Sequence, residues 1–347
     1  MRQESPQRRS VPESAASLSA RSWAWLADSG LRDGSGRVLS WLNPAHPGYV
    51  YPEIMGYYAS LCAERARHTG CERWLEFGVQ VGSAIVGELT PRGALSRAGL
   101  EYAFDTAIGL HGLLRVQRIE GSQRFVDAAQ RMTDFLVAGL AEREVSWRDG
   151  RPVRDHDSWS HSFGASAIKV PMALETAGVA LGRKDALQLA ALVREQGVAA
   201  SWRDGAFRIN GERRWVYLHA HCYATEGLLF ASRAASALPA QVRESAEFLA
   251  RVQSADGGLP CWHERPDVEV VSHADASSQA VRIWSAVSRE RYAAPIERAL
   301  GFLRSIEAAG GGLRYKRGSD DLNSWATIFG AQADQWQRDG AEPEWLL

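Results

Sequence analysis

A glycine-rich turn recurs along this chain, and each copy is followed by a stretch with helical spacing. Each glycine cluster ends a helix and permits a tight turn. Recurrence of one turn indicates that the chain builds its core by repeating a single supersecondary unit. The six copies begin near residues 33, 90, 146, 201, 254 and 307 and read DGSGRVLSW, TPRGALSRAGLEY, SWRDGRPV, SWRDGAFRI, SADGGLPCW and EAAGGGLRY.

Two kinds of helical segment alternate between these turns. One kind is amphipathic, with Leu, Phe and Val at i, i+3, i+4 and i+7 against Arg and Glu, as in residues 123–140, 242–253 and 296–307. The other kind is rich in Ala, Gly, Ser and aromatic residues, and its members start about every 48 to 60 residues. The first kind predicts an outer ring of helices, and the second predicts an inner ring whose backbones come close together. The inner segments are YPEIMGYYASLCAERA, FDTAIGLHGLLRVQRI, HSFGASAIKVPMALETAG, HAHCYATEGLLFASRA, HADASSQAVRIWSAVS and DDLNSWATIFGAQADQW.

About twelve helices in two rings predict an all-α fold, an (α/α)6 toroid. An open solenoid is the alternative, and it needs polar capping repeats at its ends. The last segment, NSWATIFGAQADQW, is as apolar as the others, which favours closure onto the first hairpin. We expect residues 17–347 to form a single domain and residues 1–16 to be a disordered polar tail.

Composition narrows the class of protein. A hydrophobic content of 45% indicates a substantial core, and a formal net charge of −1 leaves no basic stripe for nucleic acid. The sequence has no run of about 18 apolar residues, so it predicts no membrane span. No apolar region of about 7–15 residues follows the polar N-terminal segment, so a standard signal peptide is not predicted. The four cysteines form no CxxC pair, so we expect reduced thiols and a cytoplasmic location. The expected partner is a small molecule or a glycan, and the oligomeric state stays open.

The repeats also resemble known families. SAEFLARVQSADGGLPCW is similar to the Gln–Gly–Trp repeat of terpenoid cyclases and prenyltransferase β subunits, with ALGFLRSIEAAGGGLRY as a weaker copy. The six-hairpin plan resembles that of six-hairpin glycosidases, N-acylglucosamine 2-epimerase-like enzymes and glucuronyl C5-epimerases. The segments YVYPEIMGYY, LHAHCYATEGLL and NSWATIFGAQA resemble uncharacterised toroids associated with polysaccharide biosynthesis. The resemblance implies the toroid fold and leaves the chemistry open.

Residues in the first turns of inner helices should converge on one funnel. Three inner segments in succession open with histidine, which helix N-termini do not favour, and a histidine has a pKa suited to acid–base work near neutral pH. We predict His221 as base or acid, with His161 and His273 as its counterparts. Tyr223 and Glu226 are predicted to tune them or relay protons.

Other polar residues near these starts are predicted to contact substrate. Asp105 and Asp275 could instead cap their helices, and Lys169 and Arg282, which could bind a carboxylate, could instead form a buried salt bridge with Glu226 or Asp275. The predicted contacts are Tyr51, Glu53, Tyr57, Asp105, Lys169, His219, Asp275, Arg282 and Asn323.

We predict no metal and no cofactor, with zinc as the alternative. His219 and His221 are about 200° apart on a helix, so they share an ion only if the segment is extended. In an extended segment they could form a zinc site with His161 or Asp275. The Asp-x-Cys pair of prenyltransferases is incomplete here, because Ala220 stands two residues before Cys222.

These features predict a carbohydrate-active enzyme that acts on a sugar or a uronate-containing glycan by histidine-based acid–base catalysis. An epimerase or a lyase is favoured over a hydrolase, for which Glu53, Asp105 and Glu226 are the candidate carboxylates. One alternative is a terpenoid-cyclase-like enzyme, which an aromatic-lined funnel would favour. The other is a non-catalytic glycan-binding toroid.

Overall fold

The computed structural model of the protein describes residues 18–28, 30–155, 158–209 and 214–347, so the predicted tail at 1–16 lies outside the described residues. Within those ranges the chain forms twelve α-helices, which alternate between an outer and an inner position. The outer helices are α1 (Leu18–Asp28), α3 (Glu72–Gly87), α5 (Gln123–Ala141), α7 (Lys184–Ser201), α9 (Ala240–Val252) and α11 (Ala293–Ser305). The inner helices are α2 (Pro52–Thr69), α4 (Ala103–Glu120), α6 (Pro171–Ala180), α8 (Leu218–Ala231), α10 (Ala274–Ser288) and α12 (Ser324–Asp339).

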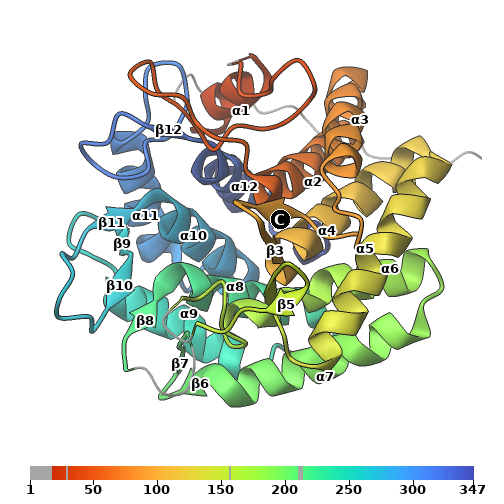
Figure 1. The fold of residues 1–347 in the computed structure, drawn as a ribbon. Coiled ribbons are helices and arrows are strands. Elements are labelled where there is room, and N and C mark those ends of the chain that lie inside the picture. Colours follow the sequence, from red (N-terminus) through yellow and green to blue (C-terminus); the bar gives the residue numbers. More distant parts are fainter. Residues whose placement is uncertain (1–17, 29, 156–157, 210–213) are drawn as a thin grey trace, which may run out of the picture.

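The inner helices close into a ring. Each contacts the next in the order α2, α4, α6, α8, α10, α12, and α12 returns to contact α2. Figure 1 shows the chain running once around this ring, with the blue α12 beside the red α1 and the orange α2. The predicted all-α (α/α)6 toroid is confirmed, and the open solenoid is wrong.

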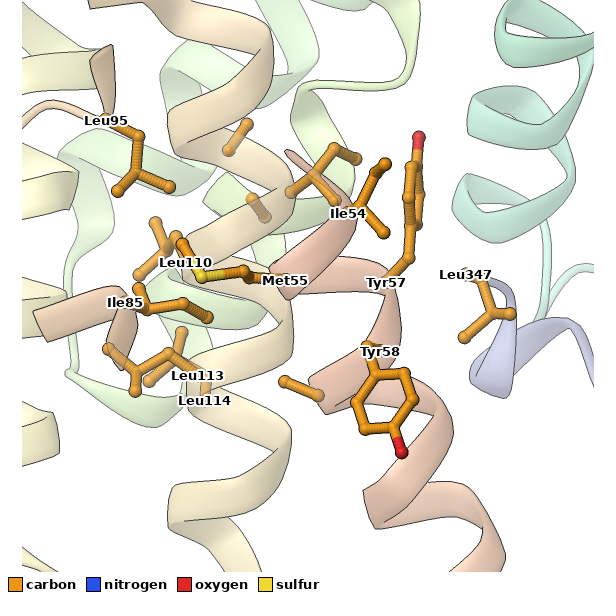
Figure 2. Close-up of a cluster of buried hydrophobic side chains, with 14 of the residues drawn as sticks. Ile54, Met55, Tyr57, Tyr58, Ile85, Leu95, Leu110, Leu113, Leu114 and Leu347 are labelled. Carbon is orange, nitrogen blue, oxygen red and sulfur yellow. The ribbon is translucent and has the colours of Figure 1, made fainter. Parts of the chain in front are cut away.

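Burial separates the two rings as their composition predicts. Helix α8 is buried at almost every position, whereas α9 buries one face only. Figure 2 shows that α2 is also buried among its neighbours. On one side, Met55 packs with Leu110 and Leu113 of α4. Tyr58 of α2 belongs to the same buried cluster, and so does Leu347 from the C-terminal segment. A helix with neighbours on every side needs no polar face, which explains the flat polarity of the inner helices α4, α6 and α8.

Short strands join the helices. Strands β3, β8, β11 and β12 lead directly into the inner helices α4, α8, α10 and α12. The strands are β1 (Trp41–Leu42), β2 (Ser96–Arg97), β3 (Leu100–Tyr102), β4 (Ser146–Arg148), β5 (Arg151–Pro152), β6 (Trp202–Arg203), β7 (Ala206–Phe207), β8 (Val216–Tyr217), β9 (Leu259–Pro260), β10 (Trp262–His263), β11 (Ser272–His273) and β12 (Leu322–Asn323). All their pairings are antiparallel, and β1 pairs with β12, which joins the first repeat to the last.

The repeated glycines hold neighbouring repeats together. Gly36, Gly93, Gly257 and Gly311 all have positive φ, a conformation that glycine adopts without strain. A Cβ at any of them would lie 2.2–2.7 Å from a backbone oxygen of an outer helix: α3, α5, α11 and α1, respectively. The glycine turns therefore let one repeat pack directly on the backbone of an outer helix.

The third inner segment differs from the prediction. Residues 161–178 were expected to be one helix, but the segment has a 3₁₀ turn, η1 (Ser166–Ile168), and α6 begins only at Pro171. Proline lacks the N–H of a helix interior and favours the first helical position. His161 therefore lies in a loop ahead of the helix and not at its start.

Two expectations from composition concerned membrane-spanning helices and the cysteines. None of the described helices is both long and apolar enough to cross a membrane. The four cysteines all lie in described residues and are free thiols. The cytoplasmic location predicted from cysteine usage stays a prediction.

Candidate functional site

A cavity of about 160 Å³ lies in the centre of the ring, where the inner helices begin. Aromatic rings make up much of its wall, and three of its side chains carry a carboxyl or imidazole group: Glu53, His219 and Asp275. The lining residues are Tyr51, Glu53, Ile54, Trp159, Tyr217, His219, Tyr223, Asp275, Tyr315 and Trp325.

Helix register decides which residues reach this cavity. Glu53, His219, Asp275 and Trp325 are each the second residue of an inner helix. Residues four and seven positions further on lie on the same helix face, one below the other. On α8 this face carries His219, Tyr223 and Glu226, and on α10 it carries Asp275, Gln279 and Arg282. The ring interior is thus built in layers, with the cavity at the top.

One wall of the cavity carries a histidine and a carboxylate. His219 Nδ1 lies 2.6 Å from Gln279 Oε1 and 3.5 Å from Asp275 Oδ2. Asp275 Oδ2 also accepts a hydrogen bond from the Tyr315 hydroxyl at 3.1 Å. The backbone N–H of Ala276 donates to Asp275 Oδ1 at 2.7 Å. Asp275 is therefore held as a hydrogen-bond acceptor beside His219.

On the α2 side the cavity is lined by the carboxyl group of Glu53, whereas the predicted contact Asp105 lies outside the lining. Helices α2 and α8 are three steps apart in the six-helix ring, and the Tyr223 hydroxyl of α8 donates to Glu53 Oε1 of α2 at 2.9 Å. Asp105 lies behind Glu53 and is buried. Burial and the charge of Glu53 raise the pKa of Asp105 well above its ordinary value, although Arg97 opposes this. Glu53 therefore lines the cavity, and Asp105 is a buried carboxyl group outside the lining that keeps its proton to higher pH than an ordinary aspartate.

A cluster of buried charges lies below the cavity. Glu226 accepts hydrogen bonds from Lys169 Nζ at 2.7 Å and from the Arg282 guanidinium, and all three side chains are fully buried. Burial lowers the pKa of Lys169 to about 8, against the opposing effect of Glu226. Burial alone would raise the pKa of Glu226, but Arg282 and Lys169 hold it below its ordinary value. Glu226 is therefore ionised at neutral pH.

Five of the predicted site residues line the cavity: Tyr51, Glu53, His219, Tyr223 and Asp275. Lys169 and Arg282 form a buried salt bridge with Glu226, which was the alternative to substrate binding. None of these three side chains lines the cavity. Tyr57 is buried next to that cluster, with its ring centroid 5.1 Å from Lys169 Nζ.

The structure does not bring His221 to the cavity. His221 is the fourth residue of α8, and its Nδ1 accepts the backbone N–H of Phe207 at 3.0 Å. Its ring packs against Phe248 of the outer helix α9, with ring centroids 5.0 Å apart. The reason is the two-position offset from His219, which turns the side chain to the other side of the helix.

Three further predicted residues also lie outside the cavity wall. His161 Nδ1 lies 2.7 Å from Ser146 Oγ, at a hydrogen-bonding distance, in the loop before α6. His273 is the N-cap of α10, and its ring lies against Tyr315 with centroids 4.5 Å apart. The Asn323 side chain caps α12 by accepting the N–H of Ala326. The predicted convergence of three histidines is therefore not found.

Several lining residues were not predicted. Tyr217 lies in β8 and Tyr315 lies in the loop before β12. Gln279, which lies one turn below the lining on α10, was not predicted either. Trp159 and Trp325 also line the cavity. The signal that would have found Trp325 and separated His219 from His221 is the register of the inner helices, in which the second residue faces the cavity.

Metal binding was considered for the same region. Among the residues that the structure describes, no three His, Cys, Asp or Glu side chains gather in a way that could hold a metal ion. The prediction that the protein works without a metal or a cofactor stays a prediction.

Comparisons with known proteins agree on the fold. No family model and no curated protein matches the chain. Solved structures do match over nearly the whole chain, and they have the same ring of helices.

Three of these structures are enzymes named for sugars. A sugar epimerase from a ruminal bacterium matches with a TM-score of 0.75 at 11% identity, covering 94% of this chain and 100% of that one. An unsaturated glucuronyl hydrolase specific for heparin matches with a TM-score of 0.71 at 12% identity, covering 94% and 98%. The cellobiose 2-epimerase from Spirochaeta thermophila DSM 6192 matches with a TM-score of 0.69 at 13% identity, covering 93% and 96%.

Proposed function

We propose that this protein is a carbohydrate-active enzyme that binds one sugar ring in the central cavity and acts on it by acid–base catalysis. The observation that carries the proposal is that one aromatic cavity is lined by titratable groups from inner helices on opposite sides of the ring. His219 and Asp275 come from α8 and α10, and Glu53 comes from α2 across the ring.

The cavity wall suits a sugar better than a larger apolar ligand. Its volume of about 160 Å³ is below the roughly 300–1,000 Å³ of pockets for drug-sized ligands, so it suits a single ring. Trp159, Tyr217 and Tyr315 offer flat apolar faces with polar edges, against which the C–H faces of a sugar can stack. Glu53 and Asp275 offer acceptors for its hydroxyl groups. The printed names of the three similar structures support the same class of substrate.

Epimerisation fits the two walls best. It removes a proton from a carbon next to a carbonyl and returns a proton to the opposite face, so it needs two groups on opposite sides of the sugar. In this scheme His219 and Glu53 take these two parts, and Tyr223 orients Glu53. A lyase would begin with the same proton removal and then expel a leaving group. Both reactions are therefore preferred over hydrolysis.

Two other enzyme classes keep some support. Glu53 and Asp275 both line the cavity, which is the arrangement that glycoside hydrolysis requires. The aromatic wall is the feature that would favour a terpenoid-cyclase-like enzyme, but the small volume and three titratable lining residues oppose a long apolar substrate. Those same residues also oppose a purely glycan-binding role.

Proton exchange with solvent tests the proposal. The full chain is incubated in D₂O with a panel of reducing monosaccharides, disaccharides and uronates, and NMR follows deuterium at the carbon next to the carbonyl. We expect deuterium incorporation or an unsaturated product, and a loss of at least about 100-fold in His219→Asn and in Glu53→Gln. His263→Gln, a partly exposed histidine outside the cavity, serves as the control.

The outcomes separate the classes. New reducing ends without deuterium incorporation would favour the hydrolase. Failure of every sugar to exchange, cleave or bind would overturn the proposal, and so would full activity of the His219→Asn variant.

A further inference from the structure

We infer that Gln279 is a positioning residue that holds His219 in the tautomer with its proton on Nδ1, so that Nε2 is the nitrogen that accepts a proton. The role of Nε2 in catalysis rests on the function proposed above, whereas the tautomer itself follows from the hydrogen bonds alone. Gln279 is fully buried on α10 and lies between His219 and the charge cluster beneath the cavity.

The starting point is the carboxylate of Glu226. It faces Lys169 and Arg282 at hydrogen-bonding distance, and these two cations keep it ionised. An ionised carboxylate accepts hydrogen bonds and cannot donate them. A neutral polar group at hydrogen-bonding distance from Glu226 must therefore present a donor.

Gln279 is the neutral group in contact with Glu226. Its side-chain nitrogen lies 3.2 Å from Glu226 Oε2 and donates to it. If the amide were turned over, its oxygen would face the carboxylate oxygen, and the contact would be repulsive. The charge cluster therefore determines the orientation of the amide, and Gln279 Oε1 must point to the other side.

On that other side Gln279 Oε1 lies 2.6 Å from His219 Nδ1. An amide oxygen has no proton, so Nδ1 must be the donor in this contact. Asp275 Oδ2, 3.5 Å from the same nitrogen, is also an acceptor. Because a neutral imidazole carries one N–H, its proton is on Nδ1 and the lone pair is on Nε2.

Helix geometry makes this connection possible. His219 and Glu226 are seven residues apart on α8 and therefore lie on one face, two turns apart. Gln279 lies on the matching face of α10, one turn below Asp275, and so reaches between the two layers. A glutamate there would oppose Glu226, and an apolar residue would leave His219 Nδ1 only the more distant Asp275 as an acceptor. Glutamine satisfies both neighbours.

The tautomer is measured directly by long-range ¹H–¹⁵N NMR on the full chain with ¹⁵N-labelled histidine, using His219→Asn to assign the signal. For the wild type we expect His219 to show a protonated Nδ1 and an unprotonated Nε2. In Gln279→Met, which keeps a similar side-chain volume, we expect a mixture of the two tautomers. With a substrate found by the deuterium assay, we also expect kcat to fall by at least about tenfold, because a wrong tautomer presents a donor where an acceptor is needed.

Gln332→Met is the matched control. Gln332 is fully buried, accepts from Arg282 and donates to Glu64, but it has no contact with His219. We expect it to lower stability to a similar extent while leaving the tautomer of His219 unchanged. A general effect of losing a buried glutamine would instead appear in both variants.

The outcomes are distinguishable from those of the proposed function. A proton on Nε2 in the wild type overturns the inference, and so does an unchanged tautomer in Gln279→Met, which would assign the role to Asp275 alone. Neither result depends on finding a substrate. An Nδ1-protonated His219 in a protein that acts on no sugar would support the tautomer and refute the proposed function.

Discussion

At the scale of single residues, His219 and His221 show how two positions on a helix separate two roles. His219 faces the cavity, whereas His221 accepts a backbone N–H from the glycine-containing turn. The fourth residues of three other inner helices, Thr106, Ser277 and Thr327, accept the equivalent N–H through their hydroxyl groups. His221 therefore occupies a position that each of these repeats uses to hold its turn.

The burial of His221 predicts sensitivity to acid. Burial lowers its pKa from 6.5 to about 3, so below pH 6.5 the unfolded chain binds a proton that the folded chain does not. Stability therefore falls as the pH drops from 6.5 towards 3, by up to about 1.4 kcal/mol per pH unit from this group. In His221→Asn, whose side-chain oxygen can still accept the N–H of Phe207, we expect this part of the slope to disappear.

Urea unfolding at a series of pH values from about 7 down to about 4 measures both slopes. The comparison is between the variant and the wild type, because other buried groups, such as Glu64, contribute equally to both. Parallel slopes for the two proteins would show that His221 does not titrate in the folded state as its burial predicts.

At the scale of secondary-structure elements, glycine determines how closely inner helices approach. A Cβ on Gly56 of α2 would lie 2.3 Å from the Ile108 oxygen of α4, and a Cβ on Gly112 of α4 would lie 2.3 Å from the Gly56 oxygen. The two helices therefore cross in direct backbone contact. Small residues in the inner segments were the basis for predicting this ring, and this crossing gives the physical reason.

Gly112→Ala should push α2 and α4 apart. We expect a loss of about 1–3 kcal/mol in the free energy of unfolding, as in other overpacked cores. The matched control is Gly301→Ala in the interior of α11, where a Cβ would meet nothing within 4 Å. That change should stabilise the protein by about 0.5–1 kcal/mol, because alanine favours the helix. Equal effects of the two substitutions in urea unfolding would contradict the close crossing.

Element boundaries explain which site residues the sequence could have identified. With inner-helix starts at Pro52, Leu218, Ala274 and Ser324, counting one residue on selects Glu53, His219, Asp275 and Trp325. The strands that precede these helices have only two or three residues, which is too short for a pattern that would mark the helix starts. Residue type alone does not distinguish His219 from His221. Tyr217 reaches the cavity from the two-residue strand β8 and Tyr315 from a loop, and neither segment is long enough to give a periodic signal in the sequence.

At the scale of the whole molecule, closure depends on the first and last repeats. The turn at Gly311 packs on the Arg21 oxygen of α1, as the turns at Gly93 and Gly257 pack on outer helices inside the chain. Beside it, the N–H of Ser324 donates to the Ser40 oxygen at 3.1 Å. The closing junction therefore resembles the internal ones, which leads us to expect a single cooperative domain.

Trp25→Ala tests this expectation. Trp25 of α1 is 6% exposed, and its ring packs directly on Gly312. The contact is so close that a Cβ on Gly312 would lie 2.7 Å from the ring. We expect a loss of about 3–5 kcal/mol, with one transition that coincides when followed by far-UV and near-UV circular dichroism. A separate early transition of the terminal hairpin, with the rest unfolding as in the wild type, would show that the ring does not unfold as one unit.

The sequence by itself determined the repeat, the two classes of helix and the region of the cavity, because glycine turns and helical periodicity act locally and are visible along the chain. Only the tertiary structure decided which of these residues meet. Glu53 and Tyr223 are brought together by ring closure across α2 and α8, and Lys169, Glu226 and Arg282 pair below the cavity and not within it. Contacts between helices far apart in the chain depend on side-chain direction and helix start, and a change of two residues reverses that direction.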